Sequence, residues 1–404
     1  MRGPRYDAIV AGAGPAGSTT AALLAGMGFR VLLLDRAAFP RDKACGEYTS
    51  PRTEQVLRRI GALEAVERAG ARRLRAFRVI SPGGHICSLE YSPVGSDGPM
   101  VLATPRRVLD AALLDHARHC GAQVRERARV EAVTMRDGQV GGVVIREGHN
   151  FREEQARLVI GADGIHSAVV RSLGIGAPLR WPRSLGMVAH YTGYTGMDDW
   201  GEMHVSRYGY AGLAPLSGGV LNVGLVMPMS HAKQLSGASA AERFEGFARS
   251  FAGVAHALSG ARRVSPVRGV GPVGARVRRT SGGGYLLVGD AAGFFDPFTG
   301  EGVYRALRGA ELAAQVAAHA LEHNDLSARS LARYSRLRRR EFAAKDMLCR
   351  LVQLFVATPA GMDYAVSRLA RRHKAREVLA AALGDLVDAG VALSPRFLLA
   401  LLRP

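Results

Sequence analysis

The sequence predicts an α/β fold with a Rossmann-like dinucleotide-binding domain, an inserted β-sheet domain of α+β type and a helical C-terminal region. Three observations lead to this prediction. A glycine-rich turn joins two apolar strands within residues 6–36, strand-like alternation recurs within residues 185–226, and helical patterns follow residue 327. At about 150 residues per domain, the 404 residues allow two or three such units.

The composition is that of a globular protein with an excess of basic residues. Hydrophobic residues make up 48% of the chain and charged residues 22%, which excludes a disordered or fibrous protein. The net charge of +19 has three interpretations. It can come from a general preference for arginine, from a protein face that attracts anionic lipid, or from nucleic-acid binding. We expect no nucleic-acid partner, because the basic residues are scattered and no recognition motif accompanies them.

The cysteines and apolar runs favour a cytoplasmic protein. The four cysteines are far apart and form no CxxC pair, so neither a zinc site nor a disulfide framework is expected. Residues 1–7 lack the apolar core of a signal peptide, and no run approaches the roughly 18 apolar residues of a membrane span. Association with a membrane surface stays open because of the basic charge.

The twelve histidines predict neither a metal site nor a catalytic relay. We expect no pair of histidines three or four residues apart beside a carboxylate, which is the spacing of metal ligands on a helix. No Ser/His/Asp arrangement is evident either. His85, His190 and His204 fall in the expected inserted domain, where each lines a pocket or is a satisfied structural residue.

The N-terminal segment has the layout of a dinucleotide-binding unit. An apolar strand at Ala8–Val10 is followed by three glycines, an Ala- and Leu-rich helix and a second apolar strand. Gly12 permits the tight turn, Gly14 lets the backbone approach a pyrophosphate, and Gly17 lets helix and strand pack closely. The helix N-terminus offers free N–H groups to the phosphates.

Four further residues complete this expected cofactor site. Pro15 and Ala16 lie between the glycines, and Asp35 ends the second strand, where its carboxylate can accept hydrogen bonds from a ribose. Arg36 follows it. FAD and NAD both use this unit. A second GxGxxG match, Gly269–Gly274, is expected to be a loop, because neither a strand nor a helix flanks it.

Two later segments also run from an apolar strand into a glycine turn. LVIGADGIHS carries Asp163 in its turn, and YLLVGDAAGFF carries Gly289 and Asp290 before a helix that begins near Glu301. In this order the motifs resemble the flavoprotein superfamily with the para-hydroxybenzoate hydroxylase fold. The resemblance implies FAD as the cofactor, Asp290 at its ribityl chain, and the helix N-terminus toward the flavin ring.

Three segments are similar to the geranylgeranyl reductase family: FPRDKACGEYTSP from residue 39, PRRVLDAALLDH from residue 105 and DPFTGEG from residue 296. The second resembles the family's R-x-x-F/L-D-x-x-L helix, whose arginine approaches FAD. Arg106 holds that spacing, with Arg107 as the one-residue alternative. The resemblance covers about residues 5–175 and 265–400. Halogenation is not expected, because the GWxWxIP segment of flavin-dependent halogenases is missing.

The family resemblance implies which residues lie near the flavin. Gly46 would allow a close backbone approach, and Glu47 is a candidate acid. Cys45 either faces the cofactor and substrate or is a small buried residue. The loop before the helix that begins near Glu301 would contact the flavin through Pro297, Gly300 and Gly302.

The expected domains are assembled from separate stretches. The FAD-binding domain takes residues 1–74, 105–180 and 265–325, the substrate domain 75–104 and 181–264, and the C-terminal region 326–404. A β-meander is expected at residues 125–150, with a turn at Asp137-Gly138.

Within the substrate domain, strands are expected at Leu185–Tyr191, Glu202–Tyr208, Tyr210–Pro215 and Val220–Val226, followed by one helix at Ala240–Phe251. In the C-terminal region, the basic run Arg336–Arg340 lies beside apolar residues. It belongs either to a helix with a solvated charged face or to a helix that docks on an anionic membrane.

These features predict an FAD-dependent oxidoreductase that reduces C=C bonds of an isoprenoid or related apolar small molecule, with NADPH or NADH as the external reductant. Cys45 and Glu47 are the candidate catalytic residues. One alternative is a monooxygenase that hydroxylates or epoxidises an aromatic or polyketide-like molecule. A second is a flavoprotein that mainly binds a partner or relays electrons to it.

Overall fold

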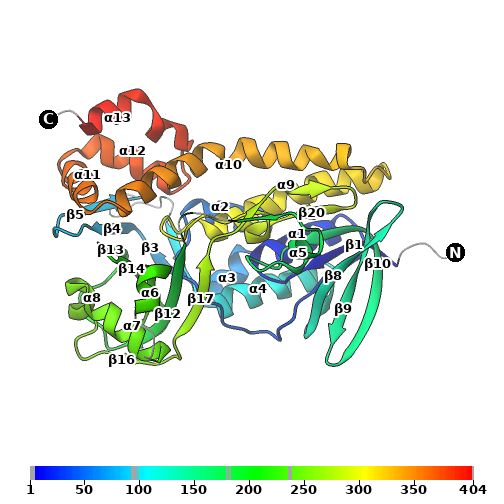
Figure 1. Ribbon diagram of the computed structural model, residues 1–404, viewed down its shortest axis with the longest axis horizontal. Helices are drawn as coiled ribbons and strands as arrows, with labels where there is room; N and C mark the ends of the chain where they lie inside the picture. Colours follow the sequence, from blue (N-terminus) through cyan, green and yellow to red (C-terminus); the bar gives the residue numbers. More distant parts are fainter. Residues whose placement is uncertain are drawn as a thin grey trace.

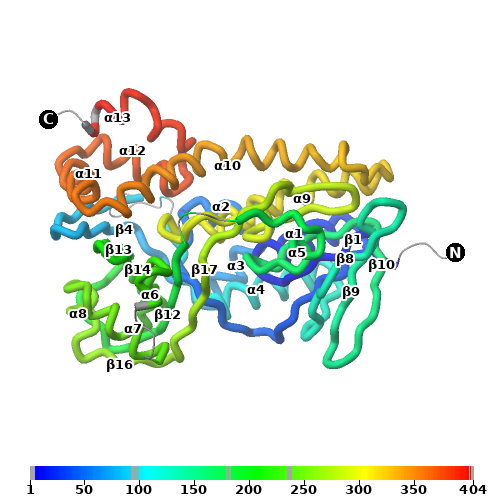
Figure 2. Tube along the Cα trace, in the orientation of Figure 1, coloured from blue at the N-terminus to red at the C-terminus, as the bar shows by residue number. Residues whose placement is uncertain are grey.

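The computed structural model describes residues 5–91, 98, 100–178, 181, 183–234 and 239–402. These residues form two large β-sheets, spread along the long axis of the molecule, and a C-terminal set of helices that lies across them (Figure 1, Figure 2). The fold is therefore of the mixed α/β class that the sequence predicts.

The first sheet carries the dinucleotide unit. Its strand order is β19-β20-β10-β1-β2-β7, and all neighbours from β20 to β7 pair in parallel. Because both faces of the sheet are covered at its centre, β1, β2, β20 and the C-terminal end of β10 are apolar runs rather than alternating ones. They are β1 (Tyr6–Ala11), β2 (Val31–Leu34), β7 (Gln123–Arg125), β10 (Asn150–Gly161), β19 (Ser281–Gly282) and β20 (Tyr285–Leu287).

Helices cover one face of this sheet and a meander covers the other. Helix α1 (Pro15–Gly26) packs between α4 (Arg106–His119) and α9 (Gly302–Glu322). On the opposite face, β8 (Ala128–Arg136) and β9 (Gln139–Glu147) extend the N-terminal half of β10 as antiparallel strands. The predicted meander is confirmed, and Asp137 and Gly138 form its turn with φ of +49° and +75°.

The second sheet has the order β16-β12-β15-β14-β13-β4-β5, with β17 also on β12. All four strands predicted from alternation are present. Its members are β4 (Ala76–Ile80), β5 (Ile86–Glu90), β12 (Ser184–Thr192), β13 (Trp200–Ser206), β14 (Gly209–Leu216), β15 (Val220–Pro228), β16 (Arg262–Arg263) and β17 (Arg268–Val273).

The structure corrects one prediction in this region and confirms another. The second GxGxxG match is not a loop, because its residues form strand β17 against β12. Pro272 fits there because β17 is an edge strand, where a missing N–H breaks no ladder bond. The helix expected at Ala240–Phe251 is present as α7 (Ala240–Arg249). A further helix, α8 (Ala252–Ala257), follows it, and both pack on one face of the second sheet.

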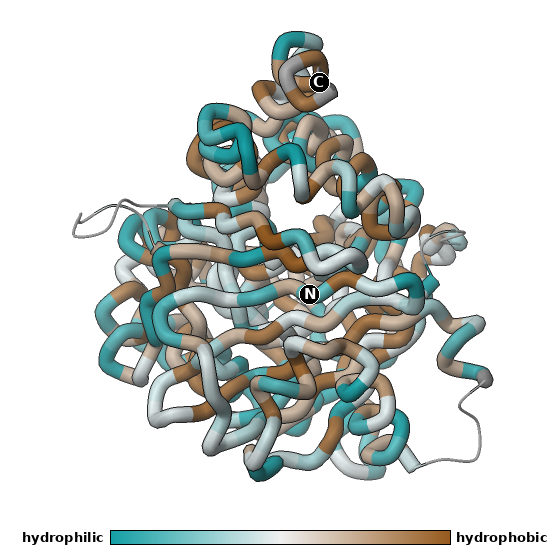
Figure 3. Tube along the Cα trace, turned by 90° about the vertical axis from the view of Figure 1, so that its left-hand side faces the viewer, coloured by the Kyte–Doolittle hydropathy of each residue, from teal (hydrophilic) through white to brown (hydrophobic). Residues whose placement is uncertain are grey.

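The C-terminal helices join the two sheets. Helix α10 (Ala328–Val356) runs along α9, and its far end packs with α11 (Pro359–Arg371), α12 (His373–Leu383) and α13 (Pro395–Leu402) near β4 and β5 (Figure 1). Pro359 and Pro395 begin helices, where the missing N–H has no helical partner to lose. Apolar and polar residues alternate along these helices (Figure 3), as expected for helices with one packed face.

Short elements connect these parts. They are α2 (Arg52–Arg59), α3 (Leu63–Arg68), β3 (Arg72–Leu74) paired with β6 (Val101–Ala103), α5 (Ala168–Ser172), β11 (Gly176–Ala177) paired with β18 (Arg276–Val277), and α6 (Met229–Gln234). Across the described ranges, none of the helices has the length and apolar character that a bilayer crossing requires.

Candidate functional site

The turn between β1 and α1 is as tight as the glycine spacing predicts. Gly12 has a φ of +98°, and a Cβ atom there would lie 2.6 Å from the carbonyl oxygen of Ala162. A Cβ atom at Gly17 would lie 1.8 Å from the carbonyl oxygen of Gly12. A side chain at either position would push the helix off the sheet. Pro15 and Ala16 are buried in the first turn of α1.

The space in front of Gly14 faces two guanidinium groups. A Cβ atom at Gly14 would lie 3.7 Å from Nη2 of Arg41 and 4.0 Å from Nη2 of Arg106. The free N–H groups of the α1 N-terminus and these cations together favour a phosphate anion. We call the site formed by Gly14, the N-terminus of α1, Arg41 and Arg106 the cradle. The pyrophosphate of FAD fits it. Arg106 points toward it, whereas Arg107 is exposed.

A buried carboxylate fixes Arg106. Its Nε and Nη2 each lie 2.8 Å from an oxygen of Asp110, one turn further along α4, and Asp110 also lies 3.3 Å from Arg41. Burial alone would lower the pKa of Arg106, but the attraction of Asp110 outweighs it, so the pKa lies above its usual range. The cradle therefore contains a fixed and permanent positive charge.

Asp35 ends β2 beside the cradle, as the motif requires. Its Oδ2 accepts a hydrogen bond from the backbone of Ala13 at 2.8 Å, and its Oδ1 accepts one from Ala37 at 2.8 Å. The carboxylate thus ties the glycine turn to the end of β2. Arg36 is exposed next to it. Contact of either residue with a ribose stays a prediction.

The turn after β20 places Asp290 at the mouth of a cavity. Gly289 has a φ of +58°, and a Cβ atom there would lie 2.8 Å from Cβ of Ala16, so the turn presses against α1. Asp290 lies 3.4 Å from Nζ of Lys43 and borders a cavity of about 510 Å³. Residues after the GADG turn, from Gly164 onward, line the same cavity.

Asp163 serves the GADG turn itself. Its Oδ2 accepts a hydrogen bond from the backbone of Ala168 at 2.6 Å, and burial raises its pKa. Its Oδ1 is buried and has no hydrogen-bond partner among the residues that the structure describes. A cofactor contact of Asp163 stays a prediction.

The segment Cys45–Glu47 lies between the two sheets, close to the cradle. A side-chain hydrogen bond from Arg106 to the Cys45 thiol contributes to the raised pKa of that arginine. The Cys45 carbonyl accepts a hydrogen bond from Nδ2 of Asn222, on β15, at 2.8 Å. Glu47 has a φ of +54°, a conformation that non-glycine residues adopt rarely and often at functional sites.

Glu47 is buried and accepts hydrogen bonds from both halves of the site. Its Oε1 lies 2.8 Å from the backbone nitrogen of Arg106, at the start of α4. Its Oε2 lies 3.0 Å from Nδ2 of Asn222 and 2.7 Å from Nε2 of His190. We call Glu47, Asn222, His190 and Ser265 the Glu47 cluster, because Nδ1 of His190 lies 3.2 Å from Oγ of Ser265.

The face of the second sheet that meets this segment carries small side chains. His190 and Asn222 are register partners on β12 and β15, so they lie on one face together with Val188 and Gly224. A Cβ atom at Gly224 would lie 3.7 Å from Val188 and 3.9 Å from Cα of Gly46. The two sheets therefore approach closely at Gly46.

The loop before α9 packs against the same segment. Gly300 has a φ of +67°, and a Cβ atom there would lie 3.0 Å from the ring of Tyr48. Pro297 precedes it, and Gly302 begins α9. The backbone N–H of Gly300 donates to the carbonyl of Pro297 at 3.0 Å and closes this turn, and the absence of a side chain at both glycines lets another group approach the backbone closely. Flavin contact by these three residues stays a prediction.

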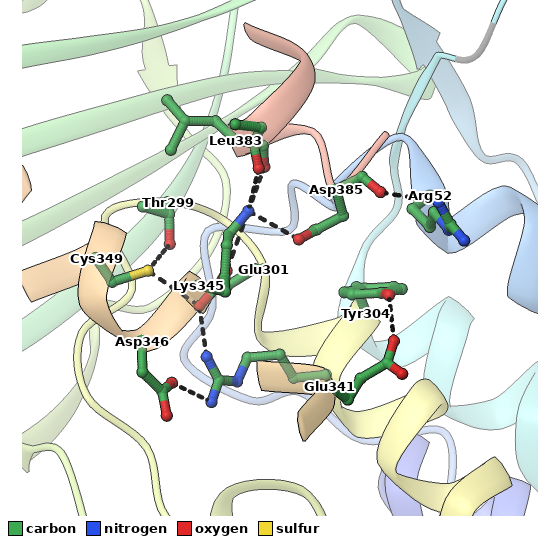
Figure 4. Close-up of polar contacts among 12 residues, drawn as sticks. Arg52, Thr299, Glu301, Tyr304, Glu341, Lys345, Asp346, Cys349, Leu383 and Asp385 are labelled. Carbon is green, nitrogen blue, oxygen red and sulfur yellow. Dashed lines mark hydrogen bonds and ion pairs between the residues drawn. The ribbon is translucent and has the colours of Figure 1, made fainter. Parts of the chain in front are cut away.

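Glu301 is the buried N-cap residue of α9. An acid at this position complements the helix dipole, but Glu301 also has two cationic side chains as partners. Its carboxylate lies 2.9 Å from Arg305, 3.3 Å from Nζ of Lys345 and 3.2 Å from the thiol of Cys349 (Figure 4). Lys345 in turn donates to the carbonyls of Ala382 and Leu383 at 2.9 and 2.8 Å, and lies 2.8 Å from Asp385.

Lys345 and Arg305 favour the charged form of Glu301, whereas burial and the nearby Glu301 raise the pKa of Asp385 despite its pairing with Lys345. Burial alone would raise the pKa of Glu301, but Lys345 and Arg305 outweigh it and hold the pKa below its usual range. Burial alone would lower the pKa of Lys345, but Asp385 and Glu301 hold it above its usual range. We call Glu301, Arg305, Lys345 and Asp385 the Glu301 cluster. It links the start of α9 to α10 and to the end of α12.

Asp296 is a functional-loop residue that the sequence did not single out. Its Oδ1 accepts hydrogen bonds from Tyr210 on β14 at 2.6 Å and from the backbone of Phe298 at 2.9 Å. Gln353 on α10 donates to the same oxygen at 2.5 Å. Burial raises the pKa of Asp296 to about 6. The Asp296 carboxyl therefore fixes the loop before α9 to both the second sheet and α10.

Within the basic run Arg336–Arg340, Arg338 borders a small cavity with Asp290 and Gly302. Contact of this run with a membrane stays a prediction. The prediction about the histidine spacing is wrong. His319, Glu322 and His323 meet at the end of α9, with ligand atoms within 4.8 Å of one another, and all three are exposed.

Comparison with known proteins agrees with the geometry of the cradle. Residues 5–349 match the family model described as FAD binding domain. A digeranylgeranylglycerophospholipid reductase of Methanosarcina mazei is 31% identical over 331 residues, covering 80% of this chain and 77% of the relative. The corresponding reductase 2 of Methanopyrus kandleri is 32% identical over 336 residues, covering 81% of each chain.

Solved structures share the fold. A geranylgeranyl bacteriochlorophyll reductase-like protein from Thermoplasma acidophilum has a TM-score of 0.75 at 23% identity and covers 98% of this chain and 95% of its own. A flavin-dependent brominase has a TM-score of 0.82 at 20% identity, covering 94% of this chain and 93% of its own.

The chain therefore belongs to the family of FAD-binding flavoproteins, and it is an FAD-dependent oxidoreductase. Within that class it is a member of the geranylgeranyl reductase-like group, as the Cys45–Glu47 and Asp296–Gly302 motifs predict.

Proposed function

We propose that the protein reduces carbon–carbon double bonds of an isoprenoid or a related apolar chain, with NADPH or NADH as the external electron donor. The observation that carries this proposal is the match of about four-fifths of the chain to curated reductases whose names specify geranylgeranyl lipids. The buried acid Glu47, beside a sheet face of small residues, supports it, because reduction of a C=C bond needs a proton donor in a dry site.

The residues around the cradle suit FAD. Arg41 and Arg106 would neutralise its pyrophosphate at the α1 N-terminus, and Asp290 would accept hydrogen bonds from its ribityl chain. Gly300 and Gly302 would let the backbone approach the ring. When bound, FAD supplies the hydride. The protein contributes orientation, exclusion of water and the proton.

The test is anaerobic turnover of the FAD-loaded protein with NADPH or NADH and a geranylgeranyl glycerophospholipid. We expect the lipid to gain two mass units for each double bond reduced. A reduced enzyme that leaves the lipid unchanged would refute the proposal.

A monooxygenase is the second candidate, because the fold is shared with a flavin-dependent brominase. Mixing the reduced enzyme with oxygen separates the two functions. A transient flavin hydroperoxide absorbance, with oxygen incorporated into an aromatic or polyketide-like molecule, would favour the monooxygenase. Direct reoxidation without such a species favours the reductase. Stable complex formation with a protein partner, without turnover by any donor, would favour an electron-relay role.

A further inference from the structure

We infer that His190 is the residue that supplies the proton for this reaction, through Glu47. The inference rests on the proposed reduction of a double bond. That reaction adds a hydride to one carbon and a proton to the other, so each turnover consumes one proton at a site closed to bulk water. A buried carboxylate that donates its proton needs a neighbour that protonates it again, and in the Glu47 cluster this neighbour is His190.

The hydrogen bonds around His190 assign a proton to each ring nitrogen. Nε2 lies 2.7 Å from the carboxylate oxygen Oε2 of Glu47, which can only accept while it is ionised. Oγ of Ser265 donates to the carbonyl of Pro266 at 3.3 Å, so it acts as an acceptor toward Nδ1 of His190 at 3.2 Å. It also accepts from the backbone nitrogen of His190 at 2.9 Å. The cluster is arranged for an imidazolium.

The pair spans the boundary between solvent and the buried site. The side chain of Glu47 is 4% exposed, whereas that of His190 is 20% exposed. Protons from solvent can therefore reach the imidazole but not the carboxylate directly. Asn222 and the backbone of Arg106 occupy the other acceptor positions of Glu47 and hold its orientation.

The step balances as follows. The proton on Nε2 of His190 moves to Oε2 of Glu47, and the O–H bond so formed breaks as the proton passes to the substrate carbon opposite the hydride. Glu47 is again a carboxylate and His190 a neutral imidazole. Solvent then returns one proton to the imidazole.

The groups that face His190 are consistent with this role. Among the described residues, Glu47 is the only charged side chain with a hydrogen bond or ion pair to the imidazole, and Asn222 and Ser265 are neutral. Arg106, whose backbone nitrogen donates to Glu47, has its side chain paired with Asp110. The adjacent Arg263 on β16 lies 3.6 Å from Glu245 instead.

A second histidine–glutamate pair offers a matched control. Nε2 of His204 lies 2.9 Å from Oε2 of Glu202 on the same sheet. His204 is the register partner of Ala211, on the face that packs against α8, where a Cβ atom at Gly253 would lie 2.3 Å from the His204 ring. It is a comparable pair away from the Cys45–Glu47 segment.

The experiment compares His190→Gln with His204→Gln in the FAD-loaded protein by stopped flow. Glutamine keeps a donor toward Glu47 but cannot pass a proton. We expect reduction of FAD by the donor to be unchanged in both variants. Reoxidation by the geranylgeranyl lipid should slow about a hundredfold in His190→Gln only. Imidazole added to the solution should restore part of the activity of His190→Ala.

Wild-type reoxidation rates in His190→Gln would overturn the inference, and so would an equal loss in His204→Gln. NMR of ¹⁵N-histidine in the cofactor-free protein adds a readout that does not depend on the substrate. We expect His190 to carry protons on both ring nitrogens, and a ring protonated on Nδ1 alone would contradict the assignment. If the wild-type protein reduces no double bond but the NMR result holds, the proposed function fails and the proton-bearing pair stands.

Discussion

Two buried glutamates flank the expected flavin position and are held in opposite ways. Glu47 is surrounded by a histidine, an amide and a backbone N–H group. Glu301 is surrounded by the fixed cations of Arg305 and Lys345. A carboxylate locked between cations keeps its charge and contributes rigidity, whereas one that is hydrogen-bonded to an imidazole has a neighbour that can exchange a proton with it. The Glu47 cluster is therefore suited to proton transfer, and the Glu301 cluster is suited to stabilising the fold.

Removing Lys345, one of the two cations of the Glu301 cluster, should give the largest change in stability. Lys345→Met leaves Asp385 buried without its cation and Glu301 with one cation instead of two. We expect the free energy of unfolding to fall by about 3–5 kcal/mol, because an unpaired buried charge is costly. Denaturant unfolding of the cofactor-free protein measures this loss.

Two controls sharpen this prediction. The double variant Lys345→Met/Asp385→Asn should recover part of the loss, because it removes one uncompensated charge. Arg58→Ala, which breaks an exposed pair with Glu54, should cost less than about 1 kcal/mol. Equal losses for Lys345→Met and Arg58→Ala would contradict the buried-charge account.

The Glu47 cluster should respond more in activity than in stability. In Glu47→Gln the amide oxygen still accepts from Asn222 and His190, but the amide nitrogen replaces the oxygen that accepts from the backbone of Arg106, and the residue no longer transfers a proton. We expect lipid reduction to fall by about a hundredfold or more, while FAD affinity changes little and the lost hydrogen bond lowers the free energy of unfolding by about 1–2 kcal/mol, less than in Lys345→Met. Steady-state rates and FAD titration check both halves of this expectation. A large loss of stability with unimpaired reduction would reverse the roles assigned to the two glutamates.

Cofactor affinity should depend on a third carboxylate. We expect Asp290→Ala to remove the proposed charge-assisted hydrogen bond to the ribityl chain, at a cost of roughly 1.5–3 kcal/mol. This corresponds to a ten- to hundredfold weaker Kd for FAD, at about 1.4 kcal/mol per decade. Fluorescence titration of the cofactor-free protein measures it. An unchanged Kd in a folded variant would argue against this placement of FAD, and Gly14→Val should abolish binding altogether.

The smallest effect concerns the proposed membrane contact. Arg336, Arg339 and Arg340 are exposed on α10, and one or two of them can face a bilayer together. At about 1 kcal/mol per arginine, changing all three to Ser should weaken binding to anionic vesicles about tenfold at low salt.

The matched control changes three exposed arginines of the β-meander, Arg127, Arg136 and Arg152, to Ser. Its net charge is the same, but co-sedimentation should hardly change. If the wild-type protein stays in the supernatant, a soluble aromatic or polyketide-like substrate becomes the better hypothesis.

The parts that the sequence predicted are those built from neighbouring residues. The glycine turn, both strands around it and the Arg106 helix are local patterns, and the structure contains each of them. Strand β17 was mistaken for a loop because Gly and Pro residues carry no strand signal. Its partner β12 supplies the hydrogen bonds that make it a strand.

The polar clusters were missed for a related reason. His190 lies 143 positions from Glu47, and Lys345 lies 44 positions from Glu301, so no local spacing connects them. Only the pairing of β12 with β15, and the passage of α10 beside the start of α9, bring these groups together. Alternation in the two strands places His190 and Asn222 on one face, but the register that makes them neighbours is a property of the fold.

The most direct test of the account is single-turnover reoxidation of the reduced, FAD-loaded enzyme by a geranylgeranyl glycerophospholipid under anaerobic conditions. Wild-type and Glu47→Gln proteins are compared at equal FAD occupancy. The account predicts that the wild-type flavin reoxidises as the lipid gains two mass units per reduced bond, and that Glu47→Gln does so about a hundred times more slowly. Equal rates in the two proteins, or reoxidation without a change in lipid mass, would contradict it.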